Sequence, residues 1–408
     1  MRRRKLSLGE ALRIKHGFAF KGEFFADRGE YIVLTPGNFH EAGGFRLRPG
    51  KDRYYAGSIP EDFVLKPGDL LVAMTEQGPG LLGSSAIVPN GELYLHNQRL
   101  GLVHALDEAL LDKAFLYYLF NTRPVRAHIS GSATGTKVRH TAPERIYRIT
   151  VDVPAKVAEQ RQIASILSAY DDLIENNRRR IQLLEQAARL LYREWFVHLR
   201  FPGHEHVTIT DGVPEGWERW LISDVCETVG GGTPSTKNNS FWEGDIIWVV
   251  PSDVTKNDCL FLLDSERKIT ESGLQQSSAK LIPPRTILMT SRASVGYFAL
   301  MDQEVCTNQG FINIIPQDDA LRMYLLFNLM SRVEEIRGNA KGTTYPEISK
   351  GRFREMNVVV PPSHLVASFS EVASRTIEQV RCLKRQVRLL QTARDLLLPR
   401  MMSGEVTV

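Results

Sequence analysis

Three short segments in each half of the chain carry side chains that could contact nucleic acid. They are rich in Gly, Ser, Thr and basic or amide side chains, and they lie between apolar runs. Lys, Ser and Thr suit phosphate oxygens, whereas Arg can donate a pair of hydrogen bonds to guanine and Gln or Asn can pair with adenine. A solvated turn is the simpler interpretation of any one residue, but the set as a whole favours DNA binding. The predicted DNA-binding residues are Gln77, Arg99, Thr136, Lys137, Arg139, His140, Ser291, Arg292, Lys341, Thr343, Thr344 and Tyr345.

The sequence contains few residues in patterns that could catalyse a reaction. The chain has no phosphate-binding G-x-x-x-x-G-K-[ST] loop, no G-x-G-x-x-G turn, no H-E-x-x-H helix and no G-x-S-x-G elbow. The nearest approach to a nuclease signature is Asp253 followed by Glu266 and Lys268, which could hold a magnesium ion. Such loose spacings arise often by chance, and the first half has no equivalent. We therefore expect no catalytic residue and no bound metal.

The two halves of the chain are copies of one unit. With a shift of 207 residues, 13 of the 38 positions from 117 to 154 are identical, for example Tyr117 and Tyr324. Ordinary composition would give roughly two identities. Within this common framework the candidate loops differ, since Lys137-Val138-Arg139 aligns with Thr344-Tyr345-Pro346. A shared framework with different side chains is what recognition of two different DNA half-sites requires.

The first part of each unit mixes strand and helix signals. Turn residues precede apolar runs at 70–74 and 286–289, and this pattern predicts strands. Apolar residues at helical spacing predict one helix over 112–121 and another over 321–330. Each unit therefore begins with a mixed α/β domain whose strands must position the candidate loops.

The second part of each unit predicts a long helix. Residues 158–199 contain no Gly or Pro, and their apolar residues recur every seven positions, as in a coiled coil. A second heptad pattern follows Ser363, which suits an N-cap. The two helices most simply pair with each other, as struts of about 60 Å between the domains. The residues predicted to pair them are Leu167, Ile174, Asn177, Ile181, Leu184, Val380, Leu383, Val387 and Leu390. Asn177 would cost stability there and fix the register or the partner.

These elements predict an α+β fold with an internal pseudo-two-fold repeat. Each of two tandem α/β domains is followed by one long coiled-coil helix. The predicted boundaries are 1–155 for the first domain, 156–200 for the central helix, 201–362 for the second domain and 363–408 for the C-terminal helix.

Composition places the chain among ordinary globular proteins. It has 408 residues, 43% of them hydrophobic and 24% charged, which is enough for two or three domains. The formal charge of +4 permits nucleic acid as a partner without requiring it. Four cysteines stand far apart with no C-x-x-C pair, which fits a reducing cytoplasm. No segment approaches the about 18 apolar residues of a membrane span, so we expect a cytoplasmic protein.

Five short motifs add to the duplication. They are Glu159-Gln160-Arg161-Gln162-Ile163, Asp171-Asp172-Leu173-Ile174-Glu175-Asn176-Asn177, Val213-Pro214-Glu215-Gly216-Trp217, Gly231-Gly232-Thr233-Pro234 and Arg394-Asp395-Leu396-Leu397-Leu398-Pro399-Arg400. Together they resemble the specificity subunits of type I restriction-modification systems, over essentially the whole chain. The first unit departs from this pattern because it has no Pro-Glu-Gly-Trp opening and begins near Leu8.

The resemblance implies two tandem α/β target recognition domains separated by two long antiparallel coiled-coil helices. Each domain would read one half of a split, asymmetric site in double-stranded DNA. It also implies that the helices dock two methyltransferase subunits, which motor-nuclease subunits join. The chain itself would have no catalytic residue and no cofactor, because S-adenosylmethionine, Mg²⁺ and ATP would belong to the partner subunits. Two alternatives are a self-sufficient magnesium-dependent nuclease that uses Asp253, Glu266 and Lys268, and a coiled-coil scaffold that does not bind DNA.

Overall fold

The chain divides into two compact units, each with cores of its own. The computed structural model describes residues 2–48, 50–76, 80–342 and 345–407. The first unit comprises residues 1–172 and 390–408, and the second comprises residues 173–389. Each unit contains one mixed α/β domain and a part of both long helices.

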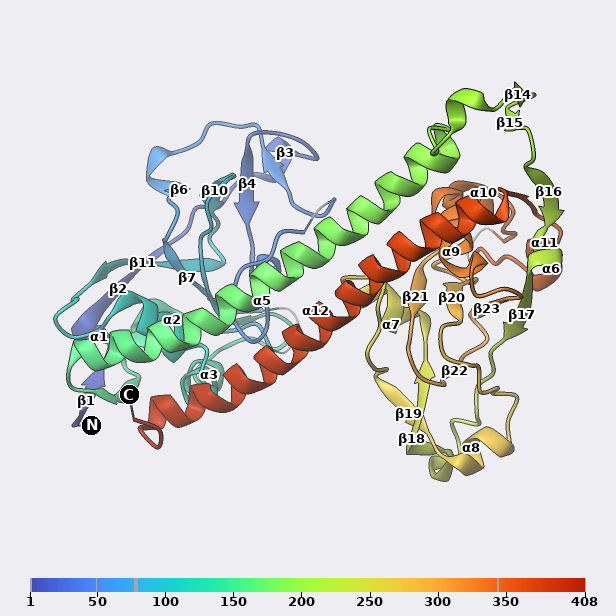
Figure 1. Ribbon diagram of the computed structural model, residues 1–408. Helices are drawn as coiled ribbons and strands as arrows, with labels where there is room; N and C mark the ends of the chain where they lie inside the picture. The colour runs from blue at the N-terminus through green and yellow to red at the C-terminus, as the bar shows by residue number, and fades with distance from the viewer. Residues whose placement is uncertain (1, 49, 77–79, 343–344, 408) are drawn as a thin grey trace. The chain divides into compact units, whose positions relative to one another are not determined.

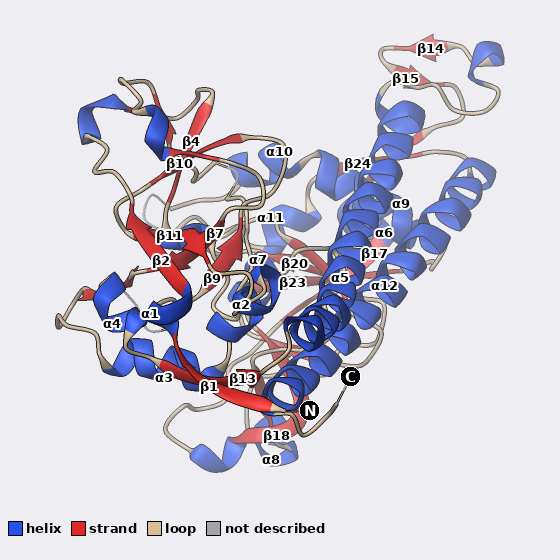
Figure 2. Cartoon of the chain, turned by 90° about the vertical axis from the view of Figure 1, so that its left-hand side faces the viewer, coloured by secondary structure: helices blue, strands red, loops and turns tan. Residues whose placement is uncertain are grey.

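In the first unit, an antiparallel four-stranded sheet carries the candidate loops (Figure 2). Its strand order is β2-β11-β7-β9, and a second sheet has the order β3-β5-β4-β10-β6. Successive side chains of β7 point to opposite faces, so Leu70 and Val72 join the core around helix α2 while Leu71 and Ala73 join a core that includes β4. The elements are β1 (Arg3–Ser7), α1 (Leu8–Ala11), β2 (Leu12–His16), β3 (Phe25–Ala26), β4 (Tyr31–Leu34), β5 (Tyr54–Tyr55), β6 (Val64–Leu65), β7 (Leu70–Ala73), β8 (Thr75–Glu76), β9 (Ser85–Ile87), β10 (Leu93–His96), β11 (Leu100–Leu106), α2 (Lys113–Phe120), α3 (Arg123–Gly131), β12 (Arg139–His140), α4 (Pro143–Tyr147) and β13 (Thr150–Pro154).

The second unit repeats this sheet with the order β17-β23-β20-β21, beside a three-stranded sheet β19-β18-β22. Leu288 of β20 packs with Val249 and Phe311 in its core. The elements are β14 (Ile209–Thr210), β15 (Val213–Pro214), β16 (Glu218–Leu221), α6 (Ile222–Val225), β17 (Cys226–Gly230), β18 (Trp242–Val249), α7 (Pro251–Lys256), β19 (Arg267–Ile269), α8 (Glu271–Gln275), β20 (Ile287–Thr290), β21 (Phe298–Leu300), β22 (Cys306–Thr307), β23 (Phe311–Pro316), α9 (Leu321–Ser331), α10 (Val333–Gly338), α11 (Lys350–Arg354) and β24 (Asn357–Val360).

The predicted duplication of the fold is confirmed strand by strand. Besides the matching sheets, β1 pairs antiparallel with β13 as β16 does with β24. The parallel pair β4 and β10 has its equivalent in β18 and β22. The first unit therefore has the entry strand of the second, although it lacks the Pro-Glu-Gly-Trp motif that precedes that strand.

Two long helices, α5 (Val157–Tyr192) and α12 (Ser363–Ser403), run antiparallel (Figure 1). In the first unit Arg394 binds the carboxylate of Asp171 at 2.6 Å. In the second unit the amide of Asn177 donates to Gln386 at 3.3 Å. Further along, Leu167 shares a core with Met401 in the first unit, and the rings of Tyr192 and Phe369 lie 5.7 Å apart in the second. Within each unit, therefore, later residues of α5 meet earlier residues of α12, as antiparallel helices require. Among the described residues, no helix combines the length and apolar character that crossing a membrane demands.

The residues predicted to pair the helices lie on their inner faces. Seven are buried, namely Leu167, Ile174, Asn177, Ile181, Val380, Leu383 and Val387, and two are half-buried, Leu184 and Leu390. The predicted long central helix is present, and it continues beyond α5 through a π-helical turn over residues 193–197. The ring of Phe196 in this turn packs against Tyr324, with 4.9 Å between the ring centroids.

The start of α5 is fixed to the first domain by the amide of Gln160, which is fully buried. Its oxygen accepts from the Asp112 amide at 2.9 Å, and its nitrogen donates to the carbonyls of Leu110 and Pro154 at 3.1 and 3.0 Å. Tyr118 adds a hydrogen bond to Asp171 at 2.7 Å. In this way the helix and the domain that carries the candidate loops become one packed unit.

Candidate nucleic-acid interface

In the first unit, the strand β7 leads directly into a short hairpin at residues 134–140. Beyond β7, strand β8 pairs with β12, and Thr134 exchanges backbone hydrogen bonds with His140 at 3.0 and 2.8 Å. Gly135 has a φ of +105°, and a Cβ there would lie 2.0 Å from the Val138 carbonyl oxygen. Only glycine fits this turn. The turn presents Thr136 and Lys137 to solvent.

A buried carboxylate holds the adjoining segment in place. Glu76 is 4% exposed, and its Oε2 accepts hydrogen bonds from the backbone amides of Gly80, Leu81 and Leu82 at 3.2, 3.1 and 2.9 Å. Its Oε1 forms an ion pair with Arg139 at 3.1 Å, and Arg139 also donates to the Ser130 carbonyl. The guanidinium of Arg139 is therefore committed to this local structure, so Arg139 positions the hairpin and is not well placed to read a base.

The turn at residues 97–99 is linked to the hairpin through Met74, whose amide donates to the Arg99 carbonyl at 3.0 Å and whose carbonyl accepts from the Thr141 amide at 2.9 Å. Asn97 is buried and accepts from the Arg99 amide at 3.0 Å, which leaves the Gln98 and Arg99 side chains exposed. Before this turn, His96 is fully buried, and its Nε2–H donates to the Leu100 carbonyl at 2.9 Å. Burial lowers the pKa of His96 to about 4, so the ring stays neutral and keeps this hydrogen bond at neutral pH.

The second unit builds the same hairpin from different side chains. Two backbone hydrogen bonds of 2.9 Å join Lys341 and Glu347. These residues align with Thr134 and His140 under the shift of 207 residues. Gly342 has a φ of +104°, close to that of Gly135. A backbone bridge joins Arg292 to Glu347 as β8 joins β12. The two units therefore share one loop geometry, on which the exposed residues differ.

Most of the predicted DNA-binding residues that the structure describes lie at this surface of their unit. The exposed ones are Arg99, Thr136, Lys137, His140, Arg292, Lys341 and Tyr345. Arg139 is half-buried, and Ser291 is 3% exposed with its backbone bonded to Gly310 and Ile348. Ser291 therefore lies beneath the loops and stabilises them, and it is not exposed for direct contact with DNA. Gln77, Thr343 and Thr344 lie outside the described residues.

A basic loop in the first unit was not predicted. Four cations fall within eight residues, namely Arg46, Arg48, Lys51 and Arg53. The carboxylate of Asp52, which lies among them, already accepts hydrogen bonds from the Asn38 side-chain amide at 2.7 Å and the Arg48 backbone amide at 2.6 Å. Arg126 ties the segment that precedes this loop to the residues beside Glu76, because it donates to the carbonyls of Glu41 and Leu82 at 2.6 and 3.0 Å. The run of cations was visible in the sequence, but this contact of the preceding segment was not.

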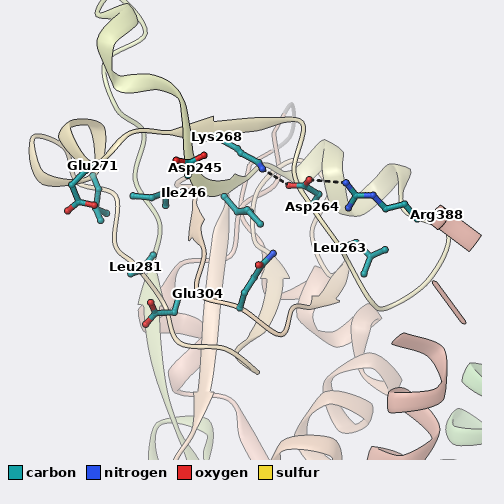
Figure 3. A pocket seen from close by; sticks show the side chains of 12 residues that line it. Asp245, Ile246, Leu263, Asp264, Lys268, Glu271, Leu281, Glu304 and Arg388 are labelled. Atoms are coloured by element: carbon teal, nitrogen blue, oxygen red, sulfur yellow. Dashed lines mark hydrogen bonds and ion pairs between the residues drawn. The ribbon is translucent and has the colours of Figure 1, made fainter. Parts of the chain in front are cut away.

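The residues of the nuclease alternative do not form a metal site. Asp253 accepts hydrogen bonds from the backbone amides of Val250 and Glu266 at 2.9 and 3.2 Å, so one oxygen stabilises the start of α7 and the other holds the segment at residue 266. Lys268 faces Asp264 at 3.5 Å, as does Arg388, in the pocket of Figure 3. Across the described ranges, no group of three or more His, Cys, Asp or Glu residues could hold a metal ion.

Comparison with known proteins connects this geometry to one family. The model of the type I restriction modification DNA specificity domain matches residues 4–186 and 214–365. The type I restriction enzyme MjaIX specificity subunit of Methanocaldococcus jannaschii is 34% identical over 181 residues, which cover 44% of this chain and 42% of that relative. The HindI specificity subunit of Haemophilus influenzae is 23% identical over 84% of this chain and 87% of its own length.

A solved structure shares the fold. The S subunit of a type I restriction-modification system from M. genitalium superposes with a TM-score of 0.63, and the match covers 98% of this chain and 96% of that one. The two sequences are 16% identical, so this likeness concerns the architecture alone.

Proposed function

The chain belongs to the family of type I restriction-modification specificity subunits, and from this premise we propose that it selects the DNA site on which methyltransferase and motor-nuclease subunits act. Its relatives are named specificity subunits, a role that is not catalytic. In this proposal S-adenosylmethionine, Mg²⁺ and ATP bind to the partner subunits.

The proposed site in double-stranded DNA is bipartite and asymmetric. One observation carries this proposal: the two units share a hairpin geometry but present different side chains on it. At aligned positions Val138 in the first unit corresponds to Tyr345 in the second, and Arg99 corresponds to Gly310. Identical backbones approach DNA alike, whereas different side chains select different bases. Each unit would therefore read its own half-site.

The exposed cations supply the sequence-independent part of the affinity. Lys137 at the hairpin tip and the basic loop around Arg46 and Lys51 carry charges with room to reach phosphate oxygens. Neutralising phosphates releases bound counterions, which makes binding depend on salt. This explains how a chain with a formal charge of only +4 can bind DNA, because the cations are needed in a few loops only.

Lys137→Ala is expected to weaken DNA binding at all sequences alike. Loss of one phosphate contact should lower the slope of log K against log salt concentration by about 1. The measurement is a salt titration of DNA binding by the assembled complex. Arg375→Ala is the matched control, since Arg375 is an exposed cation on helix α12 that pairs with Glu371. An unchanged slope for Lys137→Ala would remove this residue from the interface.

The long helices offer a docking surface for the methyltransferase subunits. Four aliphatic residues are between 50% and 56% exposed, namely Leu173, Leu183 and Leu190 on α5 and Val197 in the π-helical turn that follows it. Their spacing places them in two adjacent columns outside the helix-pairing face. A run of half-exposed aliphatic residues beside a coiled-coil contact is typical of a protein interface. We name these four residues the α5 stripe.

The same stripe recurs on α12. With a shift of 206 residues, Leu183 and Leu190 align with Leu389 and Leu396, which are 69% and 63% exposed. Two equivalent apolar surfaces would accept two copies of one partner. This duplication supports a complex with two methyltransferase subunits for each chain.

A further inference from the structure

The second unit has a hollow of about 300 Å³ among its candidate loops. Pro251, Ala293 and Tyr345 supply its apolar walls, and Arg292 and Gln309 lie at its edge. These residues come from four separate segments. Three of them converge because the Ser291 amide donates to the Gly310 carbonyl at 2.7 Å and the Ala293 amide donates to the Pro346 carbonyl at 2.9 Å. The hollow therefore belongs to the surface proposed to meet DNA.

The hollow depends on a glycine. A Cβ at Gly310 would lie 3.0 Å from the Pro251 ring and 3.1 Å from the Asn308 side-chain oxygen. The aligned residue of the first unit is Arg99, so the hollow is a feature of the second unit and not of the common framework.

Two features indicate that the hollow receives something. Tyr345 is 66% exposed, and an aromatic ring left this open at a loop surface gains from being covered. Ala293 has a φ of +62°, a strained conformation for a residue with a Cβ, of the kind that is kept at binding sites. Ala293 lines the hollow and brings no polar side-chain atom to it.

The chemistry of the DNA surface limits what the hollow could take. In the major groove the only apolar group on a base edge is the C5 methyl of thymine. Arg292 faces Glu347 with its Nε at 3.8 Å, and the Oε1 of Gln309 accepts from the Thr233 hydroxyl. The terminal N–H groups of both side chains can still donate to guanine O6 and N7, thymine O4 or adenine N7. An apolar space bordered by donors thus matches a thymine and its neighbouring bases.

We propose that this hollow binds the C5 methyl group of one thymine in the half-site of the second unit. The proposal rests on the proposed function, and it assigns Tyr345, Pro251 and Ala293 as the residues that specify that base.

Uracil scanning tests it. The assembled complex of the chain with its methyltransferase subunits is bound to target duplexes in which one thymine at a time is replaced by uracil, which removes only the methyl group. Loss of one buried methyl group should weaken binding roughly fourfold to tenfold at one position of the second half-site. The other thymines of that half-site should change less than twofold.

Variants connect that position to the hollow. Tyr345→Ala should weaken binding to the natural duplex and no longer distinguish thymine from uracil there. Gly310→Ala adds a methyl group inside the hollow, so it should weaken binding to thymine more than to uracil. Leu281→Ala is the matched control, because Leu281 is a 42% exposed apolar residue of the same unit that does not line this hollow.

The outcomes separate this proposal from the proposed function. Tight, sequence-specific binding with no position sensitive to uracil, or a second half-site without thymine on either strand, overturns the hollow as a methyl site and leaves the proposed function intact. A sensitive position that persists in Tyr345→Ala also overturns it. Absence of sequence-specific binding to any duplex overturns both.

Discussion

Loss of one of the two methyltransferase subunits is the expected result of replacing Leu183 and Leu190 with aspartate. Both side chains are at least half exposed on the α5 stripe, so the change should leave the helix intact. In a complex the two leucines would be buried, each contributing about 1.5–3 kcal/mol, and aspartates there would also have to lose their hydration. Affinity for one subunit should fall by at least about 100-fold.

The composition of the complex, measured by native mass spectrometry after co-expression, checks this result. Adding Leu389→Asp and Leu396→Asp should remove the second subunit as well. The double variant Gln182→Asp and Gln186→Asp introduces the same number of charges at exposed positions of α5 outside the stripe and should assemble normally. Normal assembly of the Leu183 and Leu190 variant, with unchanged far-UV circular dichroism, would contradict the assignment of the stripe.

Glu76→Ala is expected to disrupt the loop geometry of the first unit and leave the second unit unchanged. The substitution leaves the backbone amides of Gly80, Leu81 and Leu82 without their acceptor and Arg139 without its partner. Leaving a buried hydrogen-bond donor without its acceptor costs about 1–3 kcal/mol. That cost should appear as local opening, because these contacts lie at one edge of the domain.

Hydrogen exchange measured by mass spectrometry checks the result. Protection of the amides of residues 80–82 and 139–140 should fall in Glu76→Ala, while protection in the equivalent hairpin of the second unit stays unchanged. Glu76→Gln retains an acceptor oxygen for the amides but not the charge opposite Arg139, so it should lose less protection. The assembled Glu76→Ala complex should lose discrimination at one half-site only. Equal loss at both half-sites would contradict the independence of the two units.

The fold could be predicted from the sequence because its signals are local and repeated. A framework that recurs 207 residues later, as at Tyr117 and Tyr324, must form the same elements twice. A period of seven residues places side chains such as Ile174 and Ile181 on one face of a helix, whatever their partner is. These regularities do not depend on distant contacts, so periodicity and self-comparison are enough to find them.

The roles of single site residues depend on contacts that no local pattern records. Arg139 looks like a base reader until β8 and β12 pair and bring Glu76, 63 residues away, against its guanidinium. Ser291 lies in a polar loop segment, but hydrogen bonds to Gly310 and Ile348 bury it. The α5 stripe was likewise missed, because a leucine-rich helix shows which face is exposed only once its other face is covered.

Long-read sequencing of DNA methylation is the most direct test of whether each unit of this chain selects one half of a bipartite DNA site. The chain is co-expressed with its methyltransferase subunit in a host without methylation of its own, once in its natural form and once with residues 1–155 replaced by the corresponding domain of another family member. We predict methylated adenines in two specific half-sites separated by an unspecified spacer of fixed length. The domain exchange should change one half-site and leave the other half-site and the spacer as they were. A continuous site, or an exchange that changes both half-sites or neither, would contradict the account.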